Sequence, residues 1–301
     1  MQKFVVVALN SLLAAGLYAT MSYGLAVIYG VMRIINLAHA GLMMLAAYAT
    51  WALNDRFALD PFLSMVVVAP AFFLIGMALY ATLIRWLPRS SAGPSMQSLL
   101  LLFGVWLVVQ NLAYAIWGGD TQSILTPYTM ESVSFLGGRF GVPQILVFVA
   151  SILSLVGLNL VLRRTYLGKA IRAVTQNRDA SMLSGVNAGQ IAAVAFGIGT
   201  AFAAMAGSML STLYAFTPDF GRSFLLKAFC IIVLGGMESV TGVAVGALVL
   251  AFIENFASAY TSIPVSYQDA ISFTLLVVVL VAAPGGLPSL WRMLDRRVMA
   301  R

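Results

Sequence analysis

Residues 4–32 read FVVVALNSLLAAGLYATMSYGLAVIYGVM and contain no Asp, Glu, Lys or Arg. About 20 predominantly apolar residues are enough for a helix to cross the hydrocarbon core of a bilayer. Lipid leaves only helices and closed barrels with satisfied backbones, and barrel strands would show short alternating segments instead. This stretch therefore predicts a transmembrane helix. The same absence of charge recurs in residues 34–54, 61–84, 90–119, 140–162, 180–218 and 270–291.

The composition of the 301-residue chain fits a membrane protein rather than a water-soluble one. Hydrophobic residues make up 61% of it and charged residues 9%, whereas ordinary soluble domains have roughly 25% charged residues. We therefore expect an all-α, polytopic transmembrane helical bundle with about eight membrane segments. Some of these segments should be broken or re-entrant. Together they should form a single transmembrane domain over residues 1–301.

The charge balance and the rare residue types exclude several other classes. The net charge of +7 does not indicate nucleic acid, because the basic residues fall in short connections between apolar runs. Cys230 is the only cysteine and His39 the only histidine, so neither an intrachain disulfide nor a Cys/His metal site is expected. No cofactor is expected either. The apolar N-terminus lacks an A-x-A-like cleavage site followed by a soluble domain, which favours a first span over a signal peptide.

The basic residues predict which connections face the cytoplasm, where Lys and Arg accumulate. They crowd residues 163–178 and recur after residue 84 and in the C-terminal tail. The connections at 54–60 and 118–142 carry more acids than bases and are expected outside. The basic residues expected inside are Arg85, Arg89, Arg163, Arg164, Lys169, Arg172, Arg178, Arg292, Arg296, Arg297 and Arg301.

The segment 225–260 must cross the membrane an even number of times if the 163–188 connection and the C-terminal tail both lie inside. The run after residue 188 leads out and the last run leads in, so the segment between them must return to the outside. Gly235, Gly236 and the acidic Glu238 suit a break between two short spans or a re-entrant pair. Counting back places the N-terminus outside.

A first polar interruption lies in residues 29–41, where Arg33, Asn36 and His39 stand among apolar neighbours. Polar side chains at membrane depth are costly, so they tend to face a cavity or a partner. One interpretation is a broken helix that lines a pathway. The other is an ordinary interhelical loop in which Asn36 caps the next helix.

A second interruption lies in residues 228–256, where two apolar runs flank a glycine-containing break. Corresponding breaks in two halves of a chain suggest internal duplication and a binding or gating region. Gly242 and Gly246, four residues apart, favour close helix packing over substrate contact. Glu254 and Asn255 are either pathway residues or the interfacial end of a helix.

The basic connection at 164–185 has the pattern of two short helices. The first fits a short amphipathic helix that contains Lys169, Ala170, Ile171, Ala173 and Val174. Asp179 is expected to cap a second helix that ends near Gly185. The alternative is a basic loop that faces anionic lipid, which would explain the charge but not the apolar residues.

These three stretches resemble the membrane permeases of ATP-driven (ABC) importers of the LIV, or hydrophobic amino acid uptake, type. GLAVIYGVMRIINLAHAG (24–41) resembles a first family motif, and RTYLGKAIRAVTQNRDASMLSGVN (164–187) resembles the cytoplasmic loop of the family. KAFCIIVLGGMESVTGVAVGALVLAFIENF (227–256), with PGGL at 284–287, resembles a C-terminal motif. The resemblance extends over nearly the whole chain.

The resemblance implies a transmembrane permease subunit of an importer for branched-chain or other hydrophobic amino acids in the bacterial inner membrane. The implied partners are a second related permease subunit, or a second copy of this chain, two cytoplasmic ATPase subunits, a periplasmic substrate-binding protein and membrane lipid. Similar permeases handle urea, short amides and small carboxylates, so the substrate stays open. The implied ATPase-coupling positions are Gly168, Arg172, Ala173, Asp179 and Gly185, and the expected translocation-pathway positions are Asn36, His39, Glu254 and Asn255.

The chain is not expected to be an enzyme. It lacks the phosphate-binding pattern G-x-x-x-x-G-K-[ST], because Ala170 follows Gly168-Lys169 and Arg163 occupies the position of the first glycine. His39 has no G-x-S-x-G partner motif for protease chemistry. An ion-coupled secondary transporter is a further alternative, but only Glu238 and Glu254 stand out as ionisable groups for such coupling.

Overall fold

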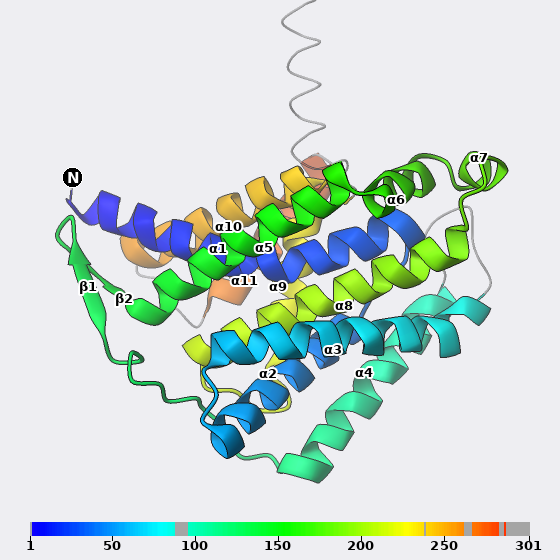
Figure 1. The fold of residues 1–301 in the computed structure, drawn as a ribbon. Helices are drawn as coiled ribbons and strands as arrows, with labels where there is room; N and C mark the ends of the chain where they lie inside the picture. Colours follow the sequence, from blue (N-terminus) through cyan, green and yellow to red (C-terminus); the bar gives the residue numbers. More distant parts are fainter. Residues whose placement is uncertain (1, 88–95, 238, 262–266, 283–285, 287–301) are drawn as a thin grey trace, which may run out of the picture.

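The computed structural model describes residues 2–87, 96–237, 239–261, 267–282 and 286. Helices dominate this part of the chain, and one short antiparallel hairpin accompanies them (Figure 1). The elements are α1 (Gln2–Met32), α2 (Ala38–Phe57), α3 (Pro61–Thr82), the 3-10 turn η1 (Ile84–Trp86), α4 (Met96–Trp117), β1 (Ser132–Phe135), β2 (Gly138–Gly141), α5 (Val142–Arg164), α6 (Tyr166–Gln176), α7 (Arg178–Leu183), α8 (Ala188–Leu213), α9 (Gly221–Gly235), α10 (Val240–Tyr260) and α11 (Gln268–Ala282).

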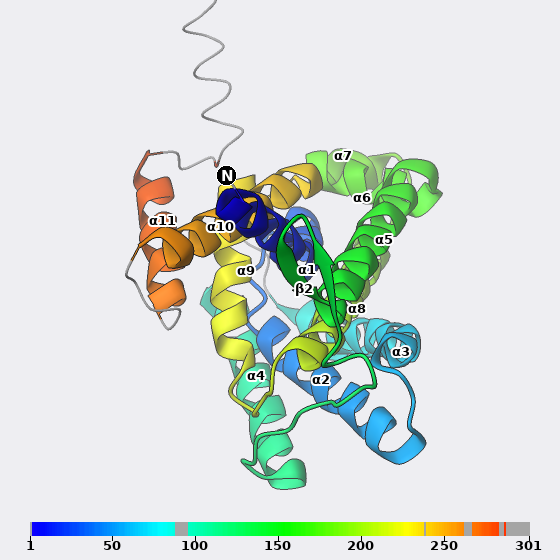
Figure 2. The same cartoon turned by 90° about the vertical axis from the view of Figure 1, so that its left-hand side faces the viewer.

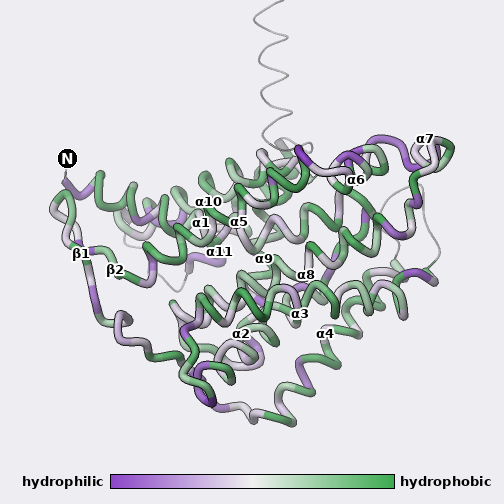
Figure 3. Tube along the Cα trace, in the orientation of Figure 1, coloured by the Kyte–Doolittle hydropathy of each residue, from purple (hydrophilic) through white to green (hydrophobic). Residues whose placement is uncertain are grey.

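The helical membrane fold predicted from the sequence is confirmed. Among the described residues, six helical segments are long and apolar enough to cross a membrane: α1, α3 with η1, α4, α5, α8 and α10. The helices α2, α9 and α11 are further apolar segments of the bundle. Figure 3 shows apolar residues along the helices and hydrophilic residues gathered around α6, α7 and the N-terminus. The hairpin β1–β2 was not predicted.

The centre of the bundle is α8, which packs on α1, α2 and α3. Small residues make this packing close: a side chain at Gly199 would meet Ile28, and one at Gly207 would meet the backbone of Met43. Lipid provides no hydrophobic drive for helix association, so such close approach is a main source of stability in membranes. In contrast, α4 is largely exposed, as a lipid-facing helix would be.

The connection between α1 and α2 returns along α1, so that α2 starts beside α1 and not beyond its end. The α1–α2 break (residues 33–37) turns at Arg33, whose φ of 53° is left-handed. His39 Nε2 then donates a 2.9 Å hydrogen bond to Met21 O, so α2 starts beside the middle of α1. The interpretation in which Asn36 caps α2 is wrong, because Leu37 holds the N-cap position without a side-chain bond.

The helices α9 and α10 meet at a turn and pack against each other beside it. The even number of crossings stays a prediction. Gly236, with φ of 86°, ends α9, and the Ser239 hydroxyl accepts a bond from Gly242 N to start α10. Gly242 and Gly246 pack against the backbone of α9, which confirms their packing role. At 15 residues, α9 is about 22 Å long, shorter than the roughly 30 Å core. Figures 1 and 2 show it crossing the direction of α1. Glu238 lies outside the described residues.

The connections lie at the two ends of the bundle in the groups that the charges predicted. At one end, Tyr128 donates a 2.6 Å hydrogen bond to Asp60, and Lys3 donates one of 2.7 Å to Ala259 O. The N-terminus and the hairpin therefore share this end, and α6 and α7 lie at the other (Figure 1). Which end faces the cytoplasm stays a prediction from the charges. Arg89 and the C-terminal arginines Arg292, Arg296, Arg297 and Arg301 lie outside the described residues.

Candidate translocation site

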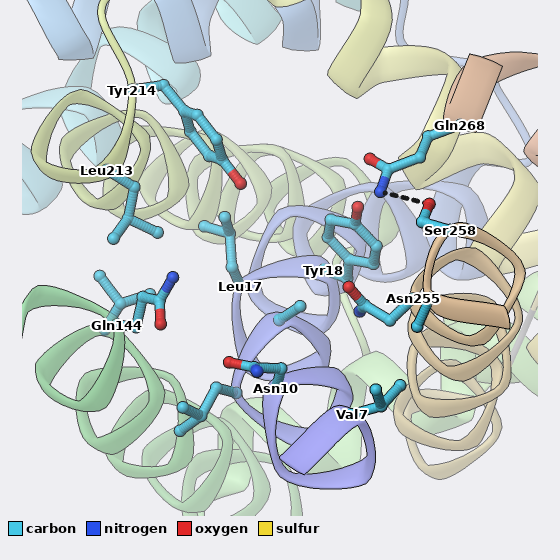
Figure 4. A pocket seen from close by; sticks show the side chains of 14 residues that line it. Val7, Asn10, Leu17, Tyr18, Gln144, Leu213, Tyr214, Asn255, Ser258 and Gln268 are labelled. Atoms are coloured by element: carbon cyan, nitrogen blue, oxygen red, sulfur yellow. Dashed lines mark hydrogen bonds between the residues drawn. The ribbon is translucent and has the colours of Figure 1, made fainter. Parts of the chain in front are cut away.

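A cavity of about 440 Å³ opens among α1, α5 and α10 near the hairpin (Figure 4). We call it the hairpin-end cavity. Its wall also includes the end of α8 and the start of α11. Polar side chains are unusually frequent in this wall for an apolar chain. The residues that line it are Val7, Asn10, Leu13, Ala14, Leu17, Tyr18, Gln144, Val147, Leu213, Tyr214, Asn255, Ser258, Ala259 and Gln268.

A second cavity, of about 390 Å³, lies between the same three helices at their opposite ends. We call it the α6-end cavity because Ile171, Arg172 and Thr175 of α6 form one of its walls. On α1 it is lined by residues from Ala26 to Val31, whereas the hairpin-end cavity is lined by residues from Val7 to Tyr18. The two cavities thus follow one another along α1.

The stretch of α1 between the two cavities, residues 19–25, is buried by its neighbours. At the edge of the hairpin-end cavity a side chain at Gly16 would lie 2.8 Å from the ring of Phe148, and Ser151 is adjacent, so α1 and α5 are in direct contact there. On the other flank, α10 packs along α1. Two cavities at opposite ends of a closed section are what a pathway with alternating access needs.

A group of charged and hydroxyl side chains lies behind the wall of the hairpin-end cavity. This charged cluster comprises Tyr18, Lys227, Glu254, Asp269 and Ser272. Lys227 Nζ is 3.2 Å from Glu254 Oε1 and 3.3 Å from Asp269 Oδ1. The Tyr18 hydroxyl donates a 2.5 Å hydrogen bond to Glu254, and Ser272 donates a short one. Glu254 is 1% exposed and Lys227 is 7% exposed, so the ion pair is buried.

The sequence reasoning found only part of this group. It selected Glu254 and Asn255, and the structure brings both to the hairpin-end cavity, Asn255 in the wall and Glu254 behind it. It missed Lys227, although a lysine among LLKAFCII is a recognisable signal. Tyr18 and Asp269 could not be selected, because only the packing of α1 and α11 against α10 brings them close.

The other two expected pathway residues lie elsewhere. Asn36 and His39 line neither of the two cavities. Both are buried around the α1–α2 break. Within the described part of the chain, both amide atoms of Asn36 and Nδ1 of His39 have no hydrogen-bond partner.

The expected coupling residues lie on α6 and α7 at the far end of the bundle. Ala170, Ile171 and Val174 are buried against the bundle and Lys169 is exposed, which confirms the amphipathic helix. Gly168 lies against the carbonyl of Leu162, where a side chain would not fit.

Arg172 donates a hydrogen bond to Leu162 O, so it fixes α6 on the end of α5. Ala173 is half-buried on α6. Two residues of α6 therefore contact the carbonyl of Leu162: Arg172 donates a hydrogen bond to it, and Gly168 packs against it.

The expected cap of α7 is corrected by the structure. Asn177, not Asp179, is the N-cap, because its side chain accepts a 3.0 Å hydrogen bond from Ala180 N. Asp179 instead lies exposed in the first helical turn, where a carboxylate favours the helix dipole. Gly185, with φ of 82°, ends α7 as predicted, and Val186 N donates back to Ser181 O.

Apolar helices around two opposed cavities define a polytopic membrane protein of the permease class. A model of the family described as the branched-chain amino acid transport system / permease component matches residues 7–280, so the chain belongs to that family. The family resemblance of the three motifs is confirmed.

Individual relatives agree along nearly the full length. The high-affinity branched-chain amino acid transport system permease protein LivH of Salmonella typhimurium is 28% identical over 292 residues, which cover 92% of this chain and 93% of that protein. The corresponding protein BraD of Pseudomonas aeruginosa is 29% identical over 288 residues, with the same coverage of 92% and 93%. A probable branched-chain amino acid transport permease protein LivH of Methanocaldococcus jannaschii is 24% identical over 295 residues, with 95% and 93% covered.

Proposed function

We propose that this chain forms the translocation pathway of an ATP-driven importer for branched-chain or other hydrophobic amino acids. The observation that carries the proposal is the pair of cavities at opposite ends of α1, separated by the buried stretch of α1 at residues 19–25. A carrier has to open to one side at a time, so one cavity has to close when the middle opens. The relatives are named as branched-chain amino acid permeases, which favours amino acids over urea, short amides or small carboxylates as the substrate.

In this proposal the pathway runs along α1 between α5 and α10. Asn255 contributes to its wall, and Glu254 lies immediately behind that wall. Asn36 and His39 would reach the pathway only if α2 moved relative to α1. Such a movement is compatible with a helix that begins at a break.

The segment 164–185 is proposed as the element that two cytoplasmic ATPase subunits move. Its apolar side chains on the outside support this role, because Tyr166 is 73% exposed and Leu183 is 91% exposed at the end of the bundle. Gly168 and Arg172 would pass the movement to α5 through Leu162. Ala173, Asp179 and Gly185 complete the proposed contact region.

Further partners follow from the same proposal. A second related permease subunit, or a second copy of this chain, would complete a dimer in the bacterial inner membrane, with lipid around its apolar helices. A periplasmic substrate-binding protein would deliver the substrate at the hairpin end. The chain itself would have no enzymatic activity and no contact with nucleic acid.

The proposed function is tested by reconstituting this permease with its ATPase subunits, second permease and binding protein in liposomes. Labelled leucine, isoleucine or valine should accumulate with ATP and should still accumulate when an ionophore collapses ion gradients. Uptake that depends on an ion gradient and not on ATP would contradict the proposal.

The coupling role has its own test. Leu183→Asp should weaken binding of the ATPase subunits by about tenfold, because it places a charge in an apolar contact. Met130→Asp is the matched control, since Met130 is 88% exposed at the other end. Equal binding of the ATPase subunits by both variants would show that α7 is not part of the interface.

A further inference from the structure

The ion pair of Lys227 and Glu254 has no function in the account above. Ionisable residues inside membrane helices are costly and usually mark a functional site. A buried ion pair is also weak support for stability, because well-packed apolar residues often do as well. The presence of this pair between α9 and α10 therefore calls for a role beyond holding the helices together.

The two partners are held very differently. Glu254 accepts a 2.5 Å hydrogen bond from Tyr18 and a short one from Ser272, so its position is firmly fixed. Among the described residues, Lys227 makes longer contacts: 3.2 Å to Glu254, 3.3 Å to Asp269 and 3.4 Å to the Tyr18 hydroxyl, and its ammonium lies 5.5 Å from the centre of the Tyr18 ring. Good charge-assisted hydrogen bonds are about 2.7 to 2.9 Å. The ammonium group is therefore held less tightly than the carboxylate of Glu254.

The charged cluster adjoins the hairpin-end cavity through three helices. Tyr18 lies in the cavity wall and touches both Lys227 and Glu254. Two further wall residues are sequence neighbours of the carboxylates: Asn255 follows Glu254, and Gln268 precedes Asp269. Figure 4 shows Tyr18, Asn255 and Gln268 on one side of the cavity. Tyr18 therefore lies between the cluster and the cavity.

The opposite side of the cavity is partly apolar. Leu17 and Leu213 face the polar side chains across the open space (Figure 4), and Val147 also lines the wall. The charged cluster thus lies behind one side of the space, and leucine side chains lie on the other side together with Gln144 and Tyr214. A small solute with both charges at one end and a hydrocarbon group at the other fits this arrangement.

We propose that Lys227 and Glu254 recognise the two charges of a zwitterionic solute and thereby select it over uncharged solutes. The carboxylate of the solute binds Lys227, and its ammonium group binds Glu254 with Asp269. Tyr18 separates the pair from the cavity until the solute arrives. This inference rests on the proposed function, because it assigns the selectivity of the same pathway.

The selectivity follows from charge compensation. A zwitterion that separates Lys227 from Glu254 gives each of them a new partner of opposite charge. An uncharged amide that did the same would leave two buried charges without compensation. Sites built around polar groups reject ligands that lack the matching groups far more strongly than they reject a change in size.

The test compares two solutes in the reconstituted full complex: labelled leucine and labelled isovaleramide, which has the same branched end but no charge. The double variant Lys227→Met/Glu254→Gln removes both charges, so neither is left unpaired. We expect leucine uptake to fall by at least about tenfold relative to isovaleramide uptake. Assembly of the complex, measured by size-exclusion chromatography, should be retained.

Thr50→Val is the matched control. It removes a buried 2.7 Å hydrogen bond between Thr50 and Ser208, away from the cavity, and should leave the ratio of the two uptake rates unchanged. A double variant that takes up leucine at the wild-type rate, or loses uptake of both solutes equally, would overturn the inference. If the wild-type complex showed no ATP-dependent leucine uptake, the proposed function itself would fail.

Discussion

The charged cluster and the α1–α2 break both place polar side chains among apolar helices, yet their surroundings are opposite. In the charged cluster Glu254 has hydroxyl and ammonium partners and adjoins a cavity. At the α1–α2 break the amide of Asn36 is buried without a partner among the described residues and lines neither cavity. Polar residues among apolar helices therefore occur both at the candidate site and at a structural break, and their hydrogen-bond partners distinguish the two.

The largest effect is expected from breaking the cluster on one side only. Glu254→Ala leaves the Lys227 ammonium buried with the half-exposed Asp269 as its remaining carboxylate. Unpaired buried charges cost about 3 to 5 kcal/mol, so the midpoint of thermal unfolding in detergent should fall markedly. The double variant Lys227→Met/Glu254→Gln should recover most of that loss, and equal stability of wild type and Glu254→Ala would contradict the ion pair.

A smaller loss is expected from overfilling the packing next to the α1–α2 break. A side chain at Gly24 would meet the backbone of Gly199 and lie 2.9 Å from His39, so Gly24→Ala forces α1 away from α8. Overpacking costs about 1 to 3 kcal/mol, again measured as thermal unfolding. Gly104→Ala is the control because nothing lies within 4 Å of that position. Equal effects of the two variants would show that α1 and α8 are not in close contact.

The smallest effect is expected at Asn36 itself. Asn36→Leu removes a buried amide that has no partner among the described residues, so stability should be unchanged or higher by up to about 1 kcal/mol. The same variant also tests the pathway role proposed for this residue. A loss of uptake at unchanged stability would show that Asn36 reaches the pathway during transport, and a large loss of stability would show that its amide has partners.

Much of the fold could be predicted because it depends on long uncharged runs and on the charge of the connections between them. The run at 4–32 became α1, and Gly235 with Gly236 became the turn between α9 and α10. The depth of the α1–α2 break could not be predicted, because it depends on His39 meeting Met21 across two helices.

The candidate site was predictable only where a single residue is unusual by itself. Glu254 stands out in an apolar run, whereas Tyr18 becomes significant only when α1 packs beside α10. Asp179 was misassigned as a cap since Asn177, two residues earlier, competes for the same backbone groups. Local patterns predict helices, but long-range contacts assemble the site.

The central claim is that one pathway along α1 joins the two cavities and opens to one end at a time. It is tested most directly by single cysteines at Asn255 and Thr241, which line the hairpin-end and α6-end cavities, in a Cys230→Ala background. Labelling of the reconstituted complex with a hydrophilic maleimide is measured with and without trapped ATP. We predict that nucleotide raises the labelling rate at one position and lowers it at the other. Rates that stay constant, or change in the same direction, would contradict the account.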